Sequence, residues 1–400
     1  MAIKKVVLAY SGGLDTSVAI PWIQENYQAE VVTLTVDLGA SRELESAKEK
    51  ALKTGAVEAY VFDGKEDFIN NYVFPALKAG ALYQGIYPLA TALGRPLIAK
   101  YLVEVAKKEG ADAVAHGCTG KGNDQVRFDV SIGALAPQLS VIAPAREWGM
   151  SRDEEKEYAK QRDIYVREDS GRIFSIDENM WGRSIEGEDL EDPWSEPPEA
   201  AFNLTSPVSD TPDEPLYLEV RFEKGVPAAL DGEGLSGVAL VQQVNRLAGE
   251  HGVGRIDHIE DRVVGIKSRE IYESPAAVVL HTALRSLEGL VLSKDQLRFK
   301  KQVAQEYAEM TYGGLWYTPL REDFDAYVES SARFVSGDVR LRLHKGSCVV
   351  VGRQSSNSLY SFDLSTYGKG DQFDHSSSKG FIDIYGLSVR NQAQRQGPKG

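Results

Sequence analysis

Cysteine and histidine are scarce in this chain of 400 residues. Its two cysteines, Cys118 and Cys348, form no C-x-x-C pair, which excludes a disulfide framework and a dithiol motif for metal or redox chemistry. The six histidines contain no H-x-x-x-H pair, so we expect no zinc site built from histidines. We therefore assign no metal ligands in the sequence.

Long apolar segments are also lacking. No run approaches the roughly 18 residues that a membrane-spanning helix needs, so we expect no membrane partner. The first apolar run, within MAIKKVVLAYSGG, has five residues before two glycines, which is too short for the hydrophobic part of a secretion signal. Together with the low cysteine content, these features predict a cytoplasmic protein in a reducing compartment.

Basic residues are outnumbered, because 45 Lys and Arg stand against 59 Asp and Glu and the formal net charge is −14. This argues against a protein whose main affinity comes from neutralising nucleic-acid phosphates, so we expect no nucleic-acid partner. Small anionic ligands are held by local donors, and the net charge does not exclude them. Hydrophobic residues at 42% and charged residues at 26% are typical of globular chains, and the length predicts two or three domains.

The first half of the chain alternates strand and helix signals. Apolar and β-branched runs predict five strands, at residues 6–9, 30–37, 57–62, 113–116 and 141–143. Helical spacing follows three of them, at residues 15–25, 43–54 and 97–108. Pro21, inside the first of these helices, should kink or shorten it. The alternation predicts an α/β domain with a parallel sheet and right-handed crossovers.

The pattern changes near residue 170. The segment 186–199 has seven acidic residues, no basic residue and three prolines, which predicts a solvated loop. It lacks the spacing and central glycine of an EF-hand, so a calcium loop is disfavoured. The rest of the chain predicts an α+β arrangement, with strands at 216–222, 339–343 and 347–351 and helices at 239–249, 276–287, 295–309 and, at the terminus, 381–389.

The most informative segment is YSGGLDTS at residues 10–17, directly between the first strand and the first helix. Ligands bind parallel sheets at the carboxyl ends of the strands. Adjacent glycines let the backbone approach a ligand, and the N–H groups at a helix start favour an anion. Ser11, Thr16 and Ser17 add hydroxyl donors. Together these features predict a site for phosphate or pyrophosphate.

The loop has two other interpretations from its sequence, a simple turn and a different nucleotide motif. A tight turn with Asp15 or Ser11 as the helix N-cap would explain two adjacent glycines alone, but the strand context, the three hydroxyls and Asp15 together favour a phosphate site. The spacing excludes a P-loop, which needs G-x-x-x-x-G-K-[ST]. It also excludes the dinucleotide fingerprint G-x-G-x-x-G, because Leu14 follows the glycine pair.

The sequence SGGLDTS resembles the pyrophosphate loop of the N-type ATP pyrophosphatases, which cleave ATP between its α- and β-phosphates. Further segments resemble one family of that group, the argininosuccinate synthetases, at residues 115–128, 174–184, 190–194, 254–273 and 380–382. The resemblance covers nearly the whole chain in order. It implies a nucleotide-binding domain at residues 1–168 that is adenine nucleotide alpha hydrolase-like, an α+β synthetase domain at 169–365, and a C-terminal helical tail at 366–400 used in oligomerisation.

A second glycine-rich loop, residues 117–122, follows a predicted strand and has three glycines in six positions. Asn123, Asp124 and Arg127 then open a helix. An amino acid needs donors for its carboxylate, which Arg127 and Thr119 supply, and an acceptor for its ammonium group, which Asp124 supplies. An Asp124–Arg127 pair alone is more typical of a surface i,i+3 ion pair, but the preceding glycines favour an amino-acid site.

The resemblance implies a ligase reaction of arginine biosynthesis and the urea cycle. The ureido oxygen of citrulline attacks the α-phosphate of ATP and displaces pyrophosphate. The amine of aspartate then attacks citrullyl-AMP, releasing AMP and argininosuccinate. Positioning and charge neutralisation carry most of such catalysis, so we assign positioning roles to Asp15, Asp124 and Arg127 and no acid–base residue. ATP would carry Mg²⁺, and the family forms homotetramers.

The same resemblance assigns the binding residues. The residues implied to bind ATP are Ala9, Tyr10, Ser11, Gly12, Gly13, Leu14, Asp15, Thr16, Ser17, Val36 and Gly117. Those implied to bind aspartate are Thr119, Asn123 and Asp124. Those implied to bind citrulline are Tyr87, Thr91, Asn123, Arg127, Ser175, Ser184, Glu260 and Tyr272. Without the resemblance, core packing would explain the two tyrosines equally well, and Glu260 would be an ordinary surface acid.

Two segments depart from the family pattern. Ala92 stands where the family often has serine, so a citrulline contact from that turn should come from Thr91. Residues 38–43 lack one glycine and the glutamine of the family segment, which affects expected contacts near adenosine. Two other functions were weighed. A tRNA-modifying ATP pyrophosphatase would normally have a basic face or catalytic cysteines, and a nucleotide-sensing module without turnover would leave the second half of the chain without a purpose.

Overall fold

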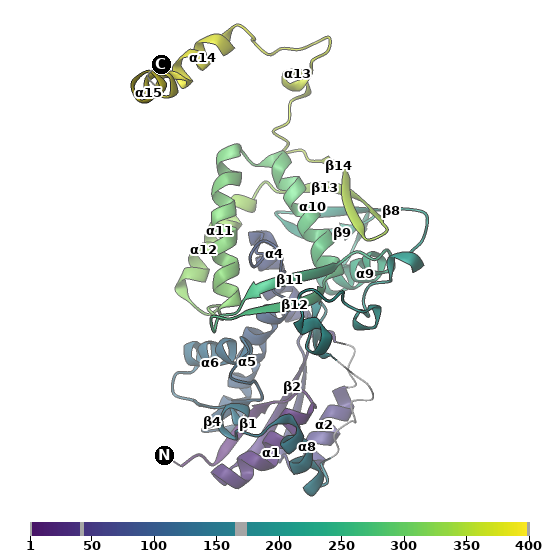
Figure 1. Ribbon diagram of the computed structural model, residues 1–400, viewed down its shortest axis with the longest axis vertical. Coiled ribbons are helices and arrows are strands. Elements are labelled where there is room, and N and C mark those ends of the chain that lie inside the picture. The colour runs from purple at the N-terminus through teal and green to yellow at the C-terminus, as the bar shows by residue number, and fades with distance from the viewer. Residues whose placement is uncertain (1, 41–43, 165–173, 398–400) are drawn as a thin grey trace. The chain divides into compact units, whose positions relative to one another are not determined.

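The computed structural model describes residues 2–40, 44–164 and 174–397 (Figure 1). The chain divides into two compact units, residues 1–357 and 358–400. Among the described residues, none of the helices combines the length and the apolar character needed to cross a bilayer.

Five parallel strands form the first sheet, in the order β3-β2-β1-β4-β5. They are β1 (Lys5–Ala9), β2 (Glu30–Asp37), β3 (Glu58–Asp63), β4 (Ala113–His116) and β5 (Ser140–Ile142). All five strands predicted from the apolar runs are confirmed. The chain first adds β2 and β3 on one side of β1 and then β4 and β5 on its other side, so the order of strands changes direction at β1. Strand β1 pairs with β4 through Ala9 and His116. The loops that follow these two strands therefore leave the sheet side by side.

Helices cover both faces of this sheet. Val6 and Leu8 of β1 pack in one core with Ile20, whereas Val7 packs in another with Phe128. The helices of this part are α1 (Leu14–Tyr27), α2 (Leu44–Lys53), α5 (Ala90–Glu109), α6 (Asp124–Leu135), α7 (Pro144–Glu147) and α8 (Arg152–Gln161). Pro21 lies inside α1, which continues to Tyr27, so the predicted shortening of this helix is wrong. An additional helical segment lies at α3 (Lys65–Phe68), the π-helix η1 (Ile69–Val73) and α4 (Phe74–Ala79).

The second half contains two antiparallel sheets, with the orders β10-β9-β8-β13-β14 and β11-β12-β7-β6. Their strands are β6 (Ser175–Asn179), β7 (Gly182–Glu186), β8 (Leu216–Glu223), β9 (Val226–Leu230), β10 (Glu233–Gly234), β11 (Arg255–Asp261), β12 (Lys267–Glu273), β13 (Gly337–His344) and β14 (Ser347–Gln354). The predicted β13–β14 hairpin is confirmed. Its two turn residues, Lys345 and Gly346, both have positive φ, at 47° and 79°, as a two-residue hairpin turn requires.

Four long helices accompany these sheets: α9 (Gly237–Glu250), α10 (Pro275–Val291), α11 (Lys294–Tyr312) and α12 (Pro319–Ala332). The acidic segment carries only short 3₁₀ turns, η2 (Glu188–Glu191) and η3 (Glu199–Ala201), and a third turn, η4 (Val208–Asp210), follows. The β6–β7 turn is fixed to the start of α5. Asn179 Nδ2 donates to the Ala90 carbonyl at 2.8 Å, and Trp181 Nε1 donates to the Pro88 carbonyl at 2.9 Å. These bonds attach the small antiparallel sheet to the nucleotide-domain helix that carries Thr91.

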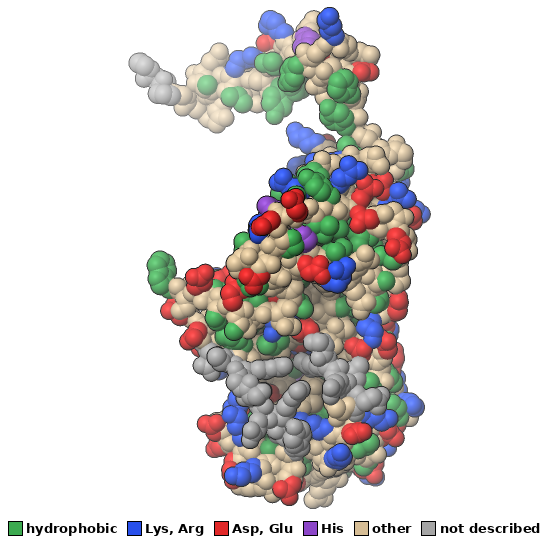
Figure 2. Space-filling model, turned by 90° about the vertical axis from the view of Figure 1, so that its right-hand side faces the viewer, with side chains coloured by type: hydrophobic (Ala, Val, Ile, Leu, Met, Phe, Trp, Pro, Cys, Tyr) green, Lys and Arg blue, Asp and Glu red, His purple; other side chains and the backbone are tan. Residues whose placement is uncertain are grey.

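The C-terminal unit contains α13 (Phe362–Ser365), α14 (Ser377–Tyr385) and α15 (Leu387–Gln396). The single helix expected at residues 381–389 is wrong, because Gly386 separates α14 from α15. Apolar side chains of this unit lie at its surface, and Figure 2 shows them in green. The most exposed in α14 and α15 are Phe381, Ile382, Ile384, Tyr385 and Val389.

Candidate active site

The loop between β1 and α1 is held by its own hydroxyl groups. Ser11 Oγ lies 3.1 Å from Thr16 Oγ1, and Ser17 Oγ donates to the Gly13 carbonyl at 2.7 Å. The buried Tyr10 places its hydroxyl 3.1 Å from Ser17 Oγ. Gly12 has a φ of +77°, which favours glycine at this position. These contacts shape the turn from within.

Helix α1 begins at Leu14, with Gly13 as its N-cap and no side-chain hydrogen bond at the cap. The interpretation of this loop as a turn capped by Ser11 or Asp15 is therefore wrong. The first N–H groups of an α-helix have no partner within the helix. At the carboxyl edge of a parallel sheet, such a helix start is suited to an anionic ligand.

The second glycine-rich loop meets the first one directly. A Cβ atom at Gly117 would lie 2.9 Å from Thr16 Cγ2, so the two loops approach as closely as they do only because residue 117 is glycine. The buried His116 fixes the start of this loop through two hydrogen bonds of its ring. Its Nδ1 accepts the Cys118 N–H at 3.2 Å, which makes Nε2 the donor to Asp129 at 2.8 Å.

Charged groups gather where α6 begins. Asp124 accepts from Arg127 Nη1 and from Arg95 Nε, both at 2.8 Å. Burial alone would raise the pKa of Asp124, but the positive charges of Arg95 and Arg127 outweigh it and lower that pKa. Arg127 is only 4% exposed, so the alternative of a surface i,i+3 ion pair is wrong. Asp124 is ionised at neutral pH and is ready to accept a hydrogen bond.

Tyrosines surround the buried carboxylate of Glu260. The Tyr272 hydroxyl donates to Glu260 Oε2 at 2.6 Å, and the Tyr312 hydroxyl donates to Oε1 at 2.5 Å. The rings of Tyr87 and Tyr272 stack with centroids 4.2 Å apart, and the Thr91 N–H donates to the Tyr87 hydroxyl at 3.0 Å. Burial is the main cause that raises the pKa of Tyr272, followed by nearby Tyr87 and Glu260. These phenols stay protonated and act as hydrogen-bond donors.

The structure places the remaining predicted residues less centrally. Ser184 is opposite Tyr272 in the β7–β12 ladder, and its Oγ donates to the Asp177 carbonyl at 3.4 Å. Ser175 is exposed on β6 opposite Glu186, and Thr119 is exposed within its loop. Val36 is half-buried near the end of β2. The structure thus brings Tyr87, Asn123, Asp124, Arg127, Glu260 and Tyr272 together and leaves Thr119 and Ser175 at the rim.

Three residues of this cluster were missed by sequence reasoning: Arg95, Asp177 and Tyr312. Arg95 of α5 forms an ion pair with Asp177 as well as with Asp124. Tyr312 ends α11 and is followed by two glycines. Gly314 has a φ of +81°, and a Cβ there would lie 2.8 Å from the Arg127 Cα. The glycine pair in the sequence TYGG was the feature from which a close approach of the chain after Tyr312 could have been predicted.

Both halves of the chain match a single family of proteins. Residues 5–165 match the model described as the arginosuccinate synthase N-terminal HUP domain, and residues 174–392 match the arginosuccinate synthase C-terminal domain. The chain is 59% identical to an argininosuccinate synthase of Dehalococcoides mccartyi (strain CBDB1), over 98% of this chain and 97% of that protein. It is 56% identical to that of Symbiobacterium thermophilum over 100% of both chains, and 56% identical to that of Gloeobacter violaceus over 98% of this chain and 99% of that protein.

The chain belongs to the argininosuccinate synthase family. The predicted α/β nucleotide-binding fold with a following α+β part is confirmed, as is the predicted class of ATP-dependent ligase. The alternatives of a tRNA-modifying pyrophosphatase and of a sensor without turnover are thereby wrong. In this chain Ala92 is fully buried in the core. Of the second departure, residues 41–43 lie outside the described residues.

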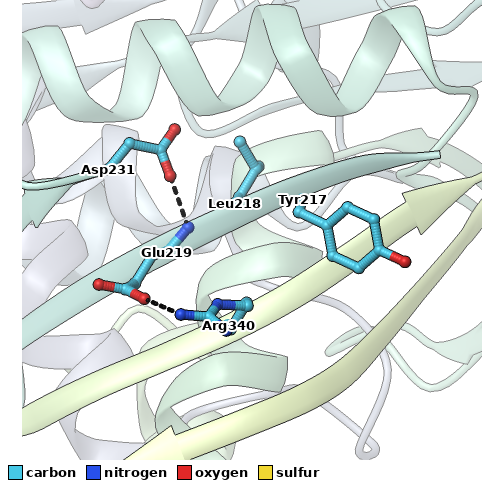
Figure 3. Close-up of a pocket in the computed structure, with 5 residues that line it drawn as sticks. All are labelled: Tyr217, Leu218, Glu219, Asp231 and Arg340. Carbon is cyan, nitrogen blue, oxygen red and sulfur yellow. Dashed lines mark hydrogen bonds and ion pairs between the residues drawn. The ribbon is translucent and has the colours of Figure 1, made fainter.

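A surface hollow on the five-stranded antiparallel sheet lies apart from these loops. Figure 3 shows its lining, in which Glu219 accepts from Arg340 at 3.0 Å and the Glu219 N–H donates to Asp231 at 2.7 Å. None of its residues belongs to the loops or to the tyrosine cluster. Glu219 is thus hydrogen-bonded to both Asp231 and Arg340, and we assign the residues of this hollow no role in the synthase reaction.

Proposed function

We propose that this chain condenses citrulline with aspartate at the expense of ATP, giving argininosuccinate, AMP and pyrophosphate. The observation that carries this proposal is the meeting of Thr16 with Gly117. An anion-binding helix start and a buried cluster suited to amino acids are adjacent at one edge of the parallel sheet. A nucleotide phosphate and an amino acid bound there would be neighbours, as adenylate formation requires.

In this proposal the loop of residues 9–17 binds the phosphates of ATP, and Val36 and Gly117 lie toward the nucleoside. The N–H groups at the start of α1 and the hydroxyls of Ser11, Thr16 and Ser17 would face the departing pyrophosphate. Mg²⁺ would enter as part of the substrate MgATP, on the phosphate oxygens. Lys50 supports the loop from outside, since its Nζ donates to the Gly12 carbonyl at 2.6 Å.

Citrulline would occupy the tyrosine cluster. Glu260 would accept from its ammonium group, and Arg127 would bind its carboxylate. A guanidinium has five donors, so Arg127 can hold a carboxylate in addition to Asp124 and the Tyr312 carbonyl. The other residues proposed to contact citrulline are Tyr87, Thr91, Asn123, Ser175, Ser184 and Tyr272. The ureido oxygen would then point toward the α-phosphate above the first loop.

Aspartate would bind beside citrulline, at the second loop. Asp124 would accept from its amino group, while Thr119 and Asn123 would bind its carboxylates. The reaction needs no enzyme nucleophile: the citrulline oxygen forms the bond to the α-phosphorus as pyrophosphate leaves. The aspartate nitrogen, after its ammonium group releases a proton to solvent, then forms the new carbon–nitrogen bond as the carbon–oxygen bond to AMP breaks and AMP leaves. The protein contributes positioning and neutralisation of charge at Asp15, Asp124 and Arg127.

The family supports a role for this protein in arginine biosynthesis. We further propose that it is a homotetramer and acts in the cytoplasm. Its reaction would also be the one that the urea cycle uses. The domain limits 1–168, 169–365 and 366–400 remain predictions. The exposed apolar side chains of α14 support a subunit contact. Phe381→Asp together with Ile384→Asp should reduce the molar mass in size-exclusion chromatography with light scattering. An unchanged mass would contradict this role of the tail.

A pyrophosphate-release assay tests the proposed function. The protein is given MgATP with single amino acids and with pairs of them. We expect no release without citrulline and sustained turnover only when aspartate is also present. Release that depends on glutamine, ammonia or a tRNA would contradict the proposal. No release under any condition would contradict it as well.

A further inference from the structure

Tyr312 contacts three of the proposed substrate-binding residues at once. Its hydroxyl donates to Glu260 Oε1 at 2.5 Å and accepts from Asn123 Nδ2 at 2.7 Å. Its carbonyl accepts from Arg127 Nε at 2.9 Å, and the Arg127 guanidinium carbon lies 4.8 Å from the centre of its ring. Glu260 comes from β11, Asn123 is the N-cap of α6 and Arg127 lies in the first turns of α6, so a single residue joins elements far apart in the sequence.

From this arrangement we infer that Tyr312 is a positioning residue that couples the citrulline and aspartate subsites. The inference rests on the proposed function, because Glu260 and Arg127 are assigned to citrulline and Asn123 to both amino acids. Tyr312 itself would touch neither substrate. Its role is to fix the orientation of the groups that do.

The Asn123 amide shows how this positioning works. Its Nδ2 donates to the Tyr312 hydroxyl, and its Oδ1 accepts the Val263 N–H at 2.9 Å. Both ends of the amide are therefore defined. A rotation by 180° would place the amide nitrogen, a donor, against the Val263 N–H, and the amide oxygen, an acceptor, against the Tyr312 hydroxyl oxygen. Each end retains hydrogen-bonding capacity for a substrate: the nitrogen has a second hydrogen and the oxygen a second lone pair. Without the Tyr312 hydroxyl, only Val263 would determine which end faces the substrates.

Arg127 is oriented by the position of Tyr312 in its helix. Tyr312 is the last residue of α11, so its carbonyl has no partner further along that helix. A helix C-terminus carries partial negative charge, which favours a guanidinium at that position. The ring of Tyr312 is fixed in turn, because it stacks on Tyr83 with centroids 3.5 Å apart and an interplanar angle of 3°. The guanidinium carbon therefore lies over a ring whose own position is fixed by stacking.

The test uses Tyr312→Phe, which keeps the ring and the carbonyl and removes only the hydroxyl. Tyr307→Phe is the matched control: Tyr307 lies on the same helix, is fully buried, and donates its hydroxyl to a carboxylate, Asp325, at 3.0 Å. Full-length wild type and both variants are assayed by pyrophosphate release, with KM measured separately for citrulline, aspartate and ATP. Thermal unfolding is recorded for all three proteins.

For Tyr312→Phe we expect the KM of citrulline and that of aspartate each to rise about tenfold, with the KM of ATP within about twofold of wild type, as the hydrogen bonds of the hydroxyl to the Glu260 carboxylate and the Asn123 amide are lost. The control should keep all three constants near wild type, even where its unfolding temperature falls. An unchanged KM for either amino acid, or equal changes in the control, would overturn the inference. A wild-type protein that does not use citrulline contradicts the proposed function first, whereas a fully active wild type with an unaltered Tyr312→Phe contradicts the inference alone.

Discussion

Thr16 and Gly117 are in such close contact that no side chain larger than hydrogen fits at residue 117. A Cβ there would lie 2.9 Å from Thr16 Cγ2. The two residues follow neighbouring strands, β1 and β4, which pair in parallel through Ala9 and His116. The loops proposed to bind phosphate and amino acid are thereby placed edge to edge, and this relationship carries the proposed reaction.

Gly117→Ala should reduce kcat/KM at least tenfold. The added methyl group must displace Thr16 or the backbone of the second loop, and overpacking of this kind costs about 1–3 kcal/mol. Gly133→Ala is the control: residue 133 is exposed in α6, and none of the described residues has an atom within 4 Å of a Cβ there. The control should keep full activity and gain roughly 0.5–1 kcal/mol of stability, as glycine is replaced within a helix. Equal activity of both variants in the pyrophosphate-release assay would contradict the close contact.

Asp124→Asn should separate the two half-reactions. The amide retains the size of the carboxylate but loses the charge proposed to bind the aspartate ammonium group. We expect the KM of aspartate to rise about tenfold to a hundredfold, the equivalent of a lost charge-assisted hydrogen bond of about 1.5–3 kcal/mol. Citrulline-dependent exchange of labelled pyrophosphate into ATP should persist. A KM of aspartate equal to that of wild type would remove this role from Asp124.

Glu260→Gln should weaken citrulline binding specifically. The substitution keeps an acceptor oxygen for only one of the Tyr272 and Tyr312 hydroxyls, places an amide NH2 group against the other, and removes the negative charge proposed to face the citrulline ammonium group. We expect the KM of citrulline to rise about tenfold or more and the KM of ATP to stay unchanged. Glu219→Gln, in the hollow of Figure 3, makes the same chemical change in a surface ion pair and should leave the kinetics unaltered. An equal KM of citrulline in Glu260→Gln and Glu219→Gln would contradict the proposed binding of citrulline by Glu260.

Glu155 of α8 gives the first loop a pH-dependent partner. Burial first, and then the charge of Asp15 and a hydrogen bond with it, raise the pKa of Glu155 from its usual 4.5 to about 8. The folded protein therefore binds one more proton than the unfolded chain between these two values. Its free energy of unfolding should fall as the pH rises through this window, with a slope of up to about 1.4 kcal/mol per pH unit.

Urea unfolding of wild type, Glu155→Gln and Glu157→Gln at a series of pH values between about 5 and 9 checks this expectation. Glutamine at 155 mimics the protonated carboxyl and should flatten the pH dependence relative to wild type. Glu157 lies exposed on the same helix, so Glu157→Gln should follow the wild-type curve. A wild-type slope that survives in Glu155→Gln would assign the pH dependence to other groups.

The parallel sheet was predictable because its strands are buried on both faces. Runs such as Val6-Val7-Leu8 are continuously apolar and are followed by glycines at the sheet edge. Strands β11 and β12 were not predicted. Their sequences, RIDHIED and KSREIYE, are rich in charged residues that find partners across the ladder, such as Asp257 with Arg269. Such pairing depends on the tertiary structure and leaves no apolar pattern.

The two loops of the site were predictable because each combines glycines with polar side chains directly after a buried strand. The cluster around Glu260 was not predictable from local patterns. Tyr87 precedes Glu260 by more than a hundred residues, and Tyr312 follows Glu260 by fifty-two. Only the resemblance to a family placed Tyr87 and Glu260 together. Tyr312 and Arg95 contact predicted site residues, but the sequence marks Tyr312 only by the two glycines that follow it and does not mark Arg95.

A crystal structure with a non-hydrolysable ATP analogue and citrulline tests the central claim most directly. The proposed function predicts the β- and γ-phosphates at residues 11–17, the nucleoside toward Val36 and Gly117, and citrulline between Arg127 and Glu260. A triphosphate bound anywhere else on the chain, or citrulline outside the tyrosine cluster, would contradict it.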